Sequence, residues 1–327
     1  MTELARAAYA AERGVDARSG LRDAQFGAYV RAFDSKRYLR ALRARGLRWL
    51  PRDDVDFPPL LAAIHDPPAG LFLRGSAAPE LLARPAVAIV GARACSPYGA
   101  QVAWMLGREL ARAGLIVVSG LARGIDGEAH RGALDAGGLT VAVLGCGIDR
   151  DYPAAHAELA RRITQSGLIV SEYAPGVEPA PWRFPARNRI IAGLCSVTVV
   201  VEARERSGAL ITTDFALEEG REVYACPGEI TSALSAGTNE LLRLGATPLT
   251  RPVDILEQFG LSERLDAPAS LSADATTVAE QLDSAKTIDE LVRSSGLDAA
   301  RVAVALSELE LGGFVVQADG VYRSTVA

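Results

Sequence analysis

Two short glycine-containing segments stand where a run of valine and isoleucine gives way to a helical pattern. The first holds Gly91-Ala-Arg93 and Ser96-Pro-Tyr98, and the second holds Ser119-Gly120 and Arg123. Backbone N–H groups at the start of a helix bind anions, and a nearby arginine adds a bidentate donor. Two such turns in succession predict a site for several phosphates in a row. The candidate contacts are Arg93, Ser96, Tyr98, Ser119, Gly120 and Arg123.

A further candidate segment is Phe184-Pro-Ala-Arg-Asn-Arg189, directly before an apolar helix. Arg187 and Arg189 are expected to point to different sides of the backbone. One would then reach a ligand while the other braces the sheet, and a structural role for both is the alternative. Trp182 and Phe184 suit either stacking on an unpaired base or forming a hydrophobic lid. This segment adds Phe184, Arg187, Asn188 and Arg189 to the candidate contacts.

Hydroxyl groups surround another strand-to-helix turn, at Ser207-Gly208 and Thr212. Such groups cap helices by default, and they also bind phosphate oxygens, so Ser207, Gly208 and Thr212 are candidates as well. Asp126, Glu172 and Glu202 are carboxylates at strand ends. No nucleophile or second carboxylate accompanies them at a catalytic spacing, and the three histidines are dispersed. We therefore expect these carboxylates to orient arginines, and we expect no catalytic residue.

No cofactor or metal is expected. A dinucleotide fingerprint needs Gly-x-Gly-x-x-Gly after the first strand and an acidic residue closing the second, whereas here Arg93 and Ser119-Gly120 occupy the key positions. Cys95, Cys146, Cys195 and Cys226 lack metal-ligand spacing. They are expected to be reduced thiols on or beside buried strands.

The elements that position these residues alternate between strand and helix. Strands are expected near 86–91, 115–119, 140–144, 168–171, 197–202 and 222–226, each rich in valine, isoleucine, leucine and alanine. Such alternation predicts an α/β fold, a Rossmann-like doubly wound parallel sheet with helices on both faces. Ligands bind such sheets at the carboxyl ends of the strands, where the candidate residues fall.

The regions outside this core differ in composition. We expect a helical accessory region at 1–46, a core at 47–257 whose residues 47–85 form a proline-rich connector, and a linker at 258–276. Residues 277–327 show a helix over 277–283, two further helices and a hairpin turning at Asp319-Gly320, which predicts a winged-helix domain.

Charge and hydropathy place the protein among soluble globular proteins. The net charge is −5, but residues 257–327 carry 5 basic against 12 acidic residues, so the acidity is concentrated in the tail. No stretch approaches the roughly 18 apolar residues of a membrane span, and the N-terminus does not resemble a secretion signal. A cytoplasmic protein without membrane contact is expected.

The ordered motifs resemble the DNA-processing protein A family, DprA, also called Smf. The resemblance covers about residues 50 to 327. It is carried by these motifs: Asp66-Pro-Pro, Leu73-Arg-Gly75, Gly91-Ala-Arg93, Ser119-Gly-x-Ala-x-Gly-Ile-Asp126, Val143-Leu-Gly-x-Gly147, Tyr152-Pro153, Phe184-Pro-x-Arg-Asn-Arg-Ile-Ile-Ala192, Ser207-Gly-x-Leu-Ile-Thr212 and Gly237-Thr-Asn239.

The resemblance implies a non-catalytic protein that binds single-stranded DNA through an extended Rossmann fold. It also implies protection of the strand, help in loading the RecA recombinase during natural transformation, and a homodimer. Two alternatives keep the fold and change the ligand: a sensor of a small nucleotide, and a nucleotide phosphoribohydrolase. The second is disfavoured because Arg206-Ser-Gly-Ala-Leu-Ile-Thr212 departs from that enzyme signature and places Glu218-Glu219 too far along the chain.

Two departures from the family pattern stand out. Residues 1–45 lack the Pro-Gly-Ile-Gly type of turn that many relatives carry, which puts a family-derived role for this region in doubt. The expected recognition helix, from Asp298 to Glu310, has one arginine against three acidic residues. Because a helix that enters a DNA groove is normally basic, we expect this domain to contact protein, or nothing, rather than duplex DNA.

Overall fold

The chain divides into two compact units, Met1–Ser262 and Glu263–Ala327. The computed structural model describes residues 2–14, 24–261, 271–311, 314–318 and 320–324. Each unit has a hydrophobic core of its own.

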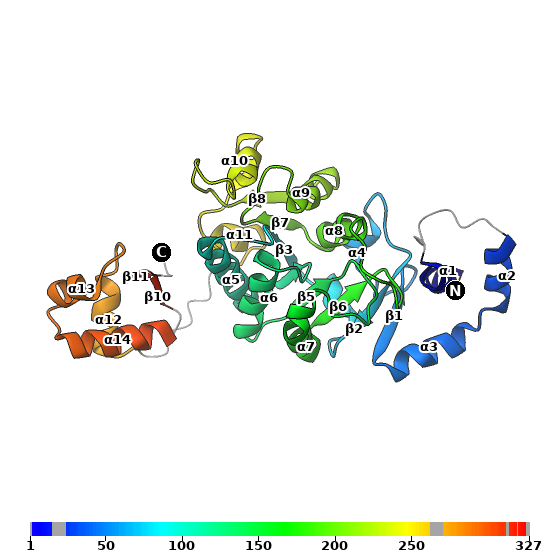
Figure 1. Ribbon diagram of the computed structural model, residues 1–327, viewed down its shortest axis with the longest axis horizontal. Helices are drawn as coiled ribbons and strands as arrows, with labels where there is room; N and C mark the ends of the chain where they lie inside the picture. The colour runs from blue at the N-terminus through cyan, green and yellow to red at the C-terminus, as the bar shows by residue number, and fades with distance from the viewer. Residues whose placement is uncertain (1, 15–23, 262–270, 312–313, 319, 325–327) are drawn as a thin grey trace. The chain divides into compact units, whose positions relative to one another are not determined.

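A nine-stranded sheet forms the centre of the first unit (Figure 1). Its order is β1-β2-β6-β5-β4-β3-β7-β8-β9, and the seven strands from β6 to β9 run parallel. The chain leaves β3 toward β4 on one side and later returns to β7 on the other, so the strand order reverses beside β3. The parallel strands are β3 (Ala86–Val90), β4 (Ile116–Ser119), β5 (Thr140–Val143), β6 (Leu168–Ser171), β7 (Val197–Val200), β8 (Glu222–Ala225) and β9 (Thr247–Pro248). The predicted fold class and its six strands are confirmed.

Helices cover both faces of this sheet because successive strand side chains point to opposite sides. Val87 and Ile89 of β3 pack in the core beneath α5 and α6, whereas Ala88 and Val90 pack in the core beneath α8. The helices on the α8 face are α4 (Pro59–Ala62), α8 (Arg183–Leu194) and α9 (Gly208–Glu218). The opposite face carries α5 (Pro97–Arg112), α6 (Ile125–Asp135), α7 (Ala157–Ser166) and α11 (Val253–Gln258), while α10 (Ala236–Arg243) lies near the β8 end of the sheet (Figure 1).

The segment 47–85 contributes two strands that the sequence did not predict. β1 (Leu47–Pro51) pairs antiparallel with β2 (Gly70–Arg74), and β2 pairs antiparallel with β6. The sheet is therefore mixed rather than wholly parallel. Prolines confine helix in this segment to α4 and the 3₁₀ helix Pro79–Ala83, but Leu71, Phe72 and Leu73 are fully buried between the prolines. Their burial accounts for the added strand.

The described residues before β1 form the helices α1 (Thr2–Arg13), α2 (Ala24–Ala32) and α3 (Ser35–Ala44). Leu4 of α1 and Leu42 of α3 are buried in the same core cluster as Phe72 of β2 and Leu159 of α7. Aromatic rings form a chain of contacts between these helices, in the order Phe26, Tyr9, Tyr29, Phe33 and Tyr38. The N-terminal helices thus share a hydrophobic core with the edge of the sheet.

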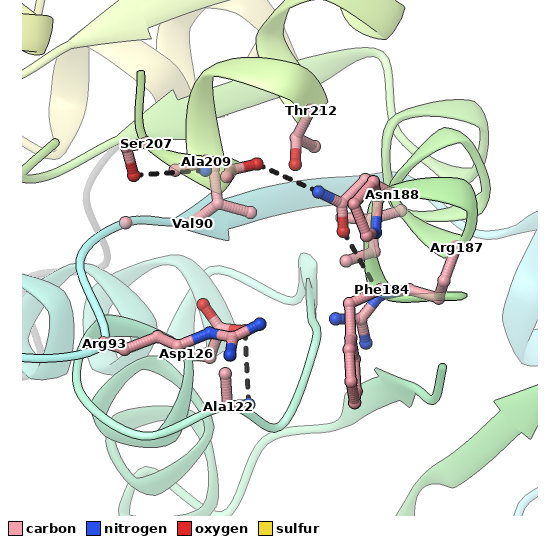
Figure 2. A pocket seen from close by; sticks show the side chains of 14 residues that line it. Val90, Arg93, Ala122, Asp126, Phe184, Arg187, Asn188, Ser207, Ala209 and Thr212 are labelled. Atoms are coloured by element: carbon pink, nitrogen blue, oxygen red, sulfur yellow. Dashed lines mark hydrogen bonds between the residues drawn. The ribbon is translucent and has the colours of Figure 1, made fainter. Parts of the chain in front are cut away.

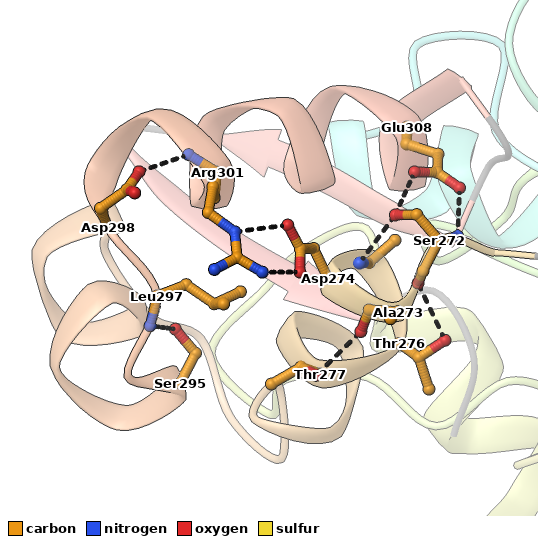
Figure 3. Close-up of polar contacts among 11 residues, drawn as sticks. Ser272, Ala273, Asp274, Thr276, Thr277, Ser295, Leu297, Asp298, Arg301 and Glu308 are labelled. Atoms are coloured by element: carbon orange, nitrogen blue, oxygen red, sulfur yellow. Dashed lines mark hydrogen bonds and ion pairs between the residues drawn. The ribbon is translucent and has the colours of Figure 1, made fainter.

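The second unit has the winged-helix fold, three helices followed by a hairpin. Its elements are α12 (Ala273–Glu280), α13 (Ile288–Ser295), α14 (Ala299–Leu311), β10 (Val315–Ala318) and β11 (Val321–Ser324). The first helix begins at Ala273, inside the range predicted as linker, because Ser272 caps it. Residues 262–270 of the predicted linker, and Asp319 of the predicted turn, lie outside the described residues. Arg301 of α14 makes a two-point ion pair with Asp274 of α12 (Figure 3).

Candidate nucleic-acid interface

Two adjoining cavities open at the carboxyl ends of β3, β4 and β5. One has a volume of about 240 Å³ and lies between the turn after β3 and the starts of α8 and α9. The other, of about 400 Å³, lies between the turns after β3, β4 and β5. Both are lined by Arg93, Ala122, Phe184 and Arg187, and Figure 2 shows the smaller one. The site therefore lies where the strand order reverses, as expected for an open α/β sheet.

The turns after β3 and β4 pack directly against each other. Gly124, the residue before α6, has a φ of +72°, and a Cβ atom there would lie 2.3 Å from the carbonyl oxygen of Ala92. Only glycine allows that backbone conformation and that approach at no cost. This close packing brings Arg93 and Arg123 to the wall of the larger cavity.

Carboxylates of the protein itself accept hydrogen bonds from several backbone N–H groups of these turns. Glu202 accepts from the backbone N–H of Ser96 at 2.9 Å and from its hydroxyl at 2.5 Å, at the N-terminus of α5. Asp126 accepts from the N–H groups of Gly120 at 3.1 Å and Ala122 at 3.3 Å. Three amides of these turns, those of Ser96, Gly120 and Ala122, thus already have carboxylate partners. The arginines remain as the main anion-binding groups of the two turns.

Arg187 is a buried cation in the wall shared by both cavities. Its Nη1 donates to the carbonyl oxygens of Gly120, at 2.9 Å, and Val143. Burial lowers the pKa of Arg187 to about 10, and the nearby Asp126 carboxylate opposes that shift. The guanidinium still carries its charge at neutral pH. A Cβ at position 120 would lie 2.6 Å from Nη2 of Arg187, so this arrangement also depends on Gly120.

Aromatic rings stand beside the exposed cations. The guanidinium of Arg93 lies 5.4 Å from the centroid of the Phe184 ring, and the ring of Tyr152 stacks on Phe184 at 5.3 Å. Arg93 and Arg123 are exposed, Tyr152 is 40% exposed and Phe184 is half-buried. Trp182 is 44% exposed and lies against Arg183 instead, outside the walls of both cavities.

Hydroxyl and amide groups complete the smaller cavity. Ser207 accepts from the N–H of Ala209 and so caps α9, and Asn188 donates to the carbonyl oxygen of Gly208 at 3.0 Å (Figure 2). Thr212 lines the same cavity but is almost fully buried. These bonds join the starts of α8 and α9 into one wall.

Nine of the thirteen residues proposed from the sequence line these cavities. They are Arg93, Gly120, Arg123, Phe184, Arg187, Asn188, Ser207, Gly208 and Thr212. The other four, Ser96, Tyr98, Ser119 and Arg189, do not contribute to either wall.

Each of these four has a different place. Ser119 is fully buried, and its hydroxyl donates to the carbonyl oxygen of Ile89. Ser96 caps α5, and Tyr98 is 55% exposed on the same helix. Arg189 is buried and forms ion pairs with Glu172 at 2.7 Å and Asp66 at 3.0 Å. Arg187 therefore reaches the cavities while Arg189 braces the fold.

Sequence reasoning did not select Tyr152 or Cys146, which line the larger cavity. Both follow β5, whose end carries the Val143-Leu-Gly-x-Gly147 motif. The sequence signal that could have identified Tyr152 is the pair Tyr152-Pro153, which follows this glycine-rich strand end. Among the described residues, no cluster of three or more histidine, cysteine or acidic residues is arranged to hold a metal ion.

Comparison with known protein families shows the family of this chain. The model of the DNA recombination-mediator protein A family matches residues 48–260, and the model of the DprA winged-helix domain matches residues 262–321. A putative DNA processing protein DprA from Mycobacterium tuberculosis is 43% identical over 306 residues, which covers 87% of this chain and 79% of that protein. The chain belongs to the DprA/Smf family.

Other DprA/Smf proteins extend this relation. Protein Smf of Escherichia coli is 41% identical over 84% of this chain and 76% of its own length. The X-ray structure of DprA from Streptococcus pneumoniae superposes with a TM-score of 0.67 at 39% identity, covering 79% of this chain and 92% of that one.

A second similar structure belongs to a relative whose description names single-stranded DNA. DprA from Helicobacter pylori, described for its single-stranded DNA binding mode, superposes with a TM-score of 0.59 at 32% identity, covering 65% of this chain and 95% of that one. In the part of this DprA/Smf chain that the structure describes, no helix is long and apolar enough to cross a membrane.

Proposed function

We propose that this protein binds single-stranded DNA in the two cavities at the carboxyl ends of β3, β4 and β5. The observation that carries the proposal is the group formed by Arg93, Phe184 and Tyr152, with Arg187 behind it. Exposed guanidinium groups attract the phosphate backbone, and the aromatic rings offer stacking surfaces for bases.

A single strand suits this arrangement better than a duplex does. The ring of Tyr152, which is 40% exposed and stacks on Phe184, stands in the wall of the larger cavity, so a base must leave its own stack to lie on it. Stacking of an unpaired base on an aromatic side chain contributes about 1–3 kcal/mol. In a duplex, pairing and stacking keep the bases away from such a wall. The single-stranded DNA binding named for the Helicobacter pylori relative supports the same choice.

Arg93 provides the direct test. Arg93→Ala should weaken binding to every single-stranded sequence and reduce the salt slope by roughly 0.7, the contribution of one phosphate on a single strand. The measurement is fluorescence anisotropy with labelled single-stranded and duplex oligonucleotides of equal length, titrated with salt and competed with mononucleotides. Arg84→Ala is a matched control, because Arg84 is an exposed arginine that precedes β3, at the opposite end of that strand.

Wild-type affinity in both Arg93→Ala and Arg123→Ala would contradict this placement of the strand. Binding of mononucleotides alone would favour the nucleotide sensor, and release of a free base from a mononucleotide would favour the hydrolase.

We further propose that the bound strand is protected from nucleases and delivered to the RecA recombinase in natural transformation or recombination, by a protein that acts as a homodimer. Membership of a recombination-mediator family supports this role. The rate of RecA assembly on single-stranded DNA should rise with the wild-type protein and not with Arg93→Ala. Light scattering at increasing concentration measures the oligomeric state.

A further inference from the structure

An exposed basic surface outside the cavities lies on α3. Between Arg31 and Arg48 the chain carries seven basic residues and one acidic residue, in a protein whose net charge is −5. Lys36, Arg40 and Arg43 are spaced i, i+4 and i+7, which places them on one face of the helix. We call these three residues the basic face of α3. The site described above does not account for it.

The cations of this face are exposed to solvent, and no partner for them lies among the described residues. Lys36, Arg40 and Arg43 are exposed, and within the described part of the chain no carboxylate lies at ion-pair distance from any of them. Asp34 caps the helix through the backbone N–H of Arg37. Several other arginines on helix surfaces of this protein, such as Arg161, form an ion pair with a carboxylate three residues away. The basic face is therefore free to bind an external anion.

The helix itself is held firmly in place. Leu42 is buried, and Tyr38 and Leu39 pack against the cluster that contains Leu47 of β1 and Leu159 of α7. The apolar side of α3 thus faces the core of the first unit, and the basic side faces away from it. Substitutions on the basic side leave this packing intact.

The C-terminal end of α3 reaches the loop that borders the larger cavity. Arg45, directly after α3, makes an ion pair with Asp149 at 2.7 Å. Tyr152, three residues further along the same loop, lines the cavity. The other carboxylate between them, Asp151, is paired with Arg74 at 2.5 Å. Both acidic side chains on this path are therefore neutralised by arginines.

We propose that the basic face of α3 binds the phosphates of the single strand after it leaves the cavities past Tyr152. This inference rests on the proposed function and extends it to the N-terminal helices. Lys36 and Arg43 are separated by seven residues, or about 10 Å along the helix axis. One strand rises roughly 3.4 Å along its axis per phosphate, so that distance corresponds to about three phosphate steps, and each cation can face a different phosphate.

The test compares oligonucleotides of two lengths. The variant K36A/R40A/R43A should bind an oligonucleotide of about six residues, which fills only the cavities, as tightly as the wild type does. It should bind one of about twenty residues at least tenfold more weakly at low salt, with a salt slope reduced by about 2, because three single-strand phosphate contacts are lost. Fluorescence anisotropy measures both, and thermal unfolding checks that the variant is folded.

The matched control removes three exposed cations elsewhere. R84A/R161A/R243A changes the net charge by the same amount within the first unit and should bind both lengths as the wild type does. Wild-type binding of both lengths by the α3 variant would overturn the proposal. So would an equal loss for both lengths, or a loss confined to duplex DNA. If the wild-type protein binds neither length, the proposed function itself fails, which is a separate outcome.

Discussion

Two arginines of one short segment have different tasks in this structure. Arg187 and Arg189 are two residues apart on α8, so their side chains leave the helix about 200° apart. Arg187 faces the cavities, and Arg189 faces Glu172 and Asp66 on the other side. The sequence predicted this division but not which arginine would take which role. That choice follows from the rotation of α8 on the sheet, which the local sequence does not specify.

We predict that Arg189→Met acts on stability rather than on DNA. The substitution removes the cation that faces the buried carboxylate of Glu172, and breaking such a pair costs about 3–5 kcal/mol of unfolding free energy. Urea denaturation measures this loss. Binding of single-stranded DNA by the folded fraction should stay close to that of the wild type. A variant with wild-type stability and weakened binding would instead show that Arg189 contacts DNA.

Single residues could be assigned to the site only where local structure exposes their side chains. Arg93, Arg123 and Phe184 could be placed in the site because a glycine-rich strand end or a pre-helical position exposes them. Ser119 looked equivalent, but its hydroxyl bonds the backbone of β3, thirty residues away in sequence. Glu202 fills the N-terminus of α5 from a still greater distance. Such partners arise from the tertiary fold and leave no local signal.

Whole elements were predicted where their hydrophobic pattern is long and regular. The six strands from β3 to β8 are nearly continuous runs of buried aliphatic residues, and the sequence located them closely. β1 and β2 are short and lie among prolines, which are typical of turns. Their pairing joins residues about 25 positions apart, such as Leu47 with Arg74. Only the structure shows that this pair extends the sheet beyond β6.

The turns after β3 and β4 act as one element, and Gly124→Ala tests that. A Cβ there would meet the backbone oxygens of Ala92 at 2.3 Å and Arg93 at 2.8 Å, and the φ of +72° strains any residue with a side chain. We expect a loss of roughly 2 kcal/mol or more in unfolding free energy, because neither backbone can yield cheaply. Moving the turns apart also separates Arg93 from Arg123, so affinity for single-stranded DNA should fall.

Gly137→Ala is the control for this effect. Gly137 has a φ of +68°, but nothing lies within 4 Å of a Cβ at that position. That variant should lose some stability through backbone strain and keep its affinity for DNA. Equal effects of the two substitutions on affinity would mean that the contact between the turns does not position the arginines.

At the scale of the whole molecule, charge is divided between the two units. Residues 263–327 carry 5 basic against 11 acidic residues. Arg301, the arginine near the start of α14, is held by Asp274 through two bonds of 2.8 and 2.5 Å (Figure 3). A recognition helix normally directs such a cation at DNA. This internal pairing supports the prediction that the winged-helix domain does not bind duplex DNA.

We expect the first unit alone, residues 1–262, to fold and to bind single-stranded DNA. Its core clusters contain only its own residues, and both cavities are lined by it alone. At about 0.15 M salt, where the Debye length is about 8 Å, its affinity should match that of the full chain. At lower salt it should bind more tightly, because the acidic second unit no longer repels the phosphates. Anisotropy titrations of both proteins over a salt series measure this difference. A truncated protein that folds but binds tenfold more weakly at every salt concentration would show that the second unit takes part in holding the strand.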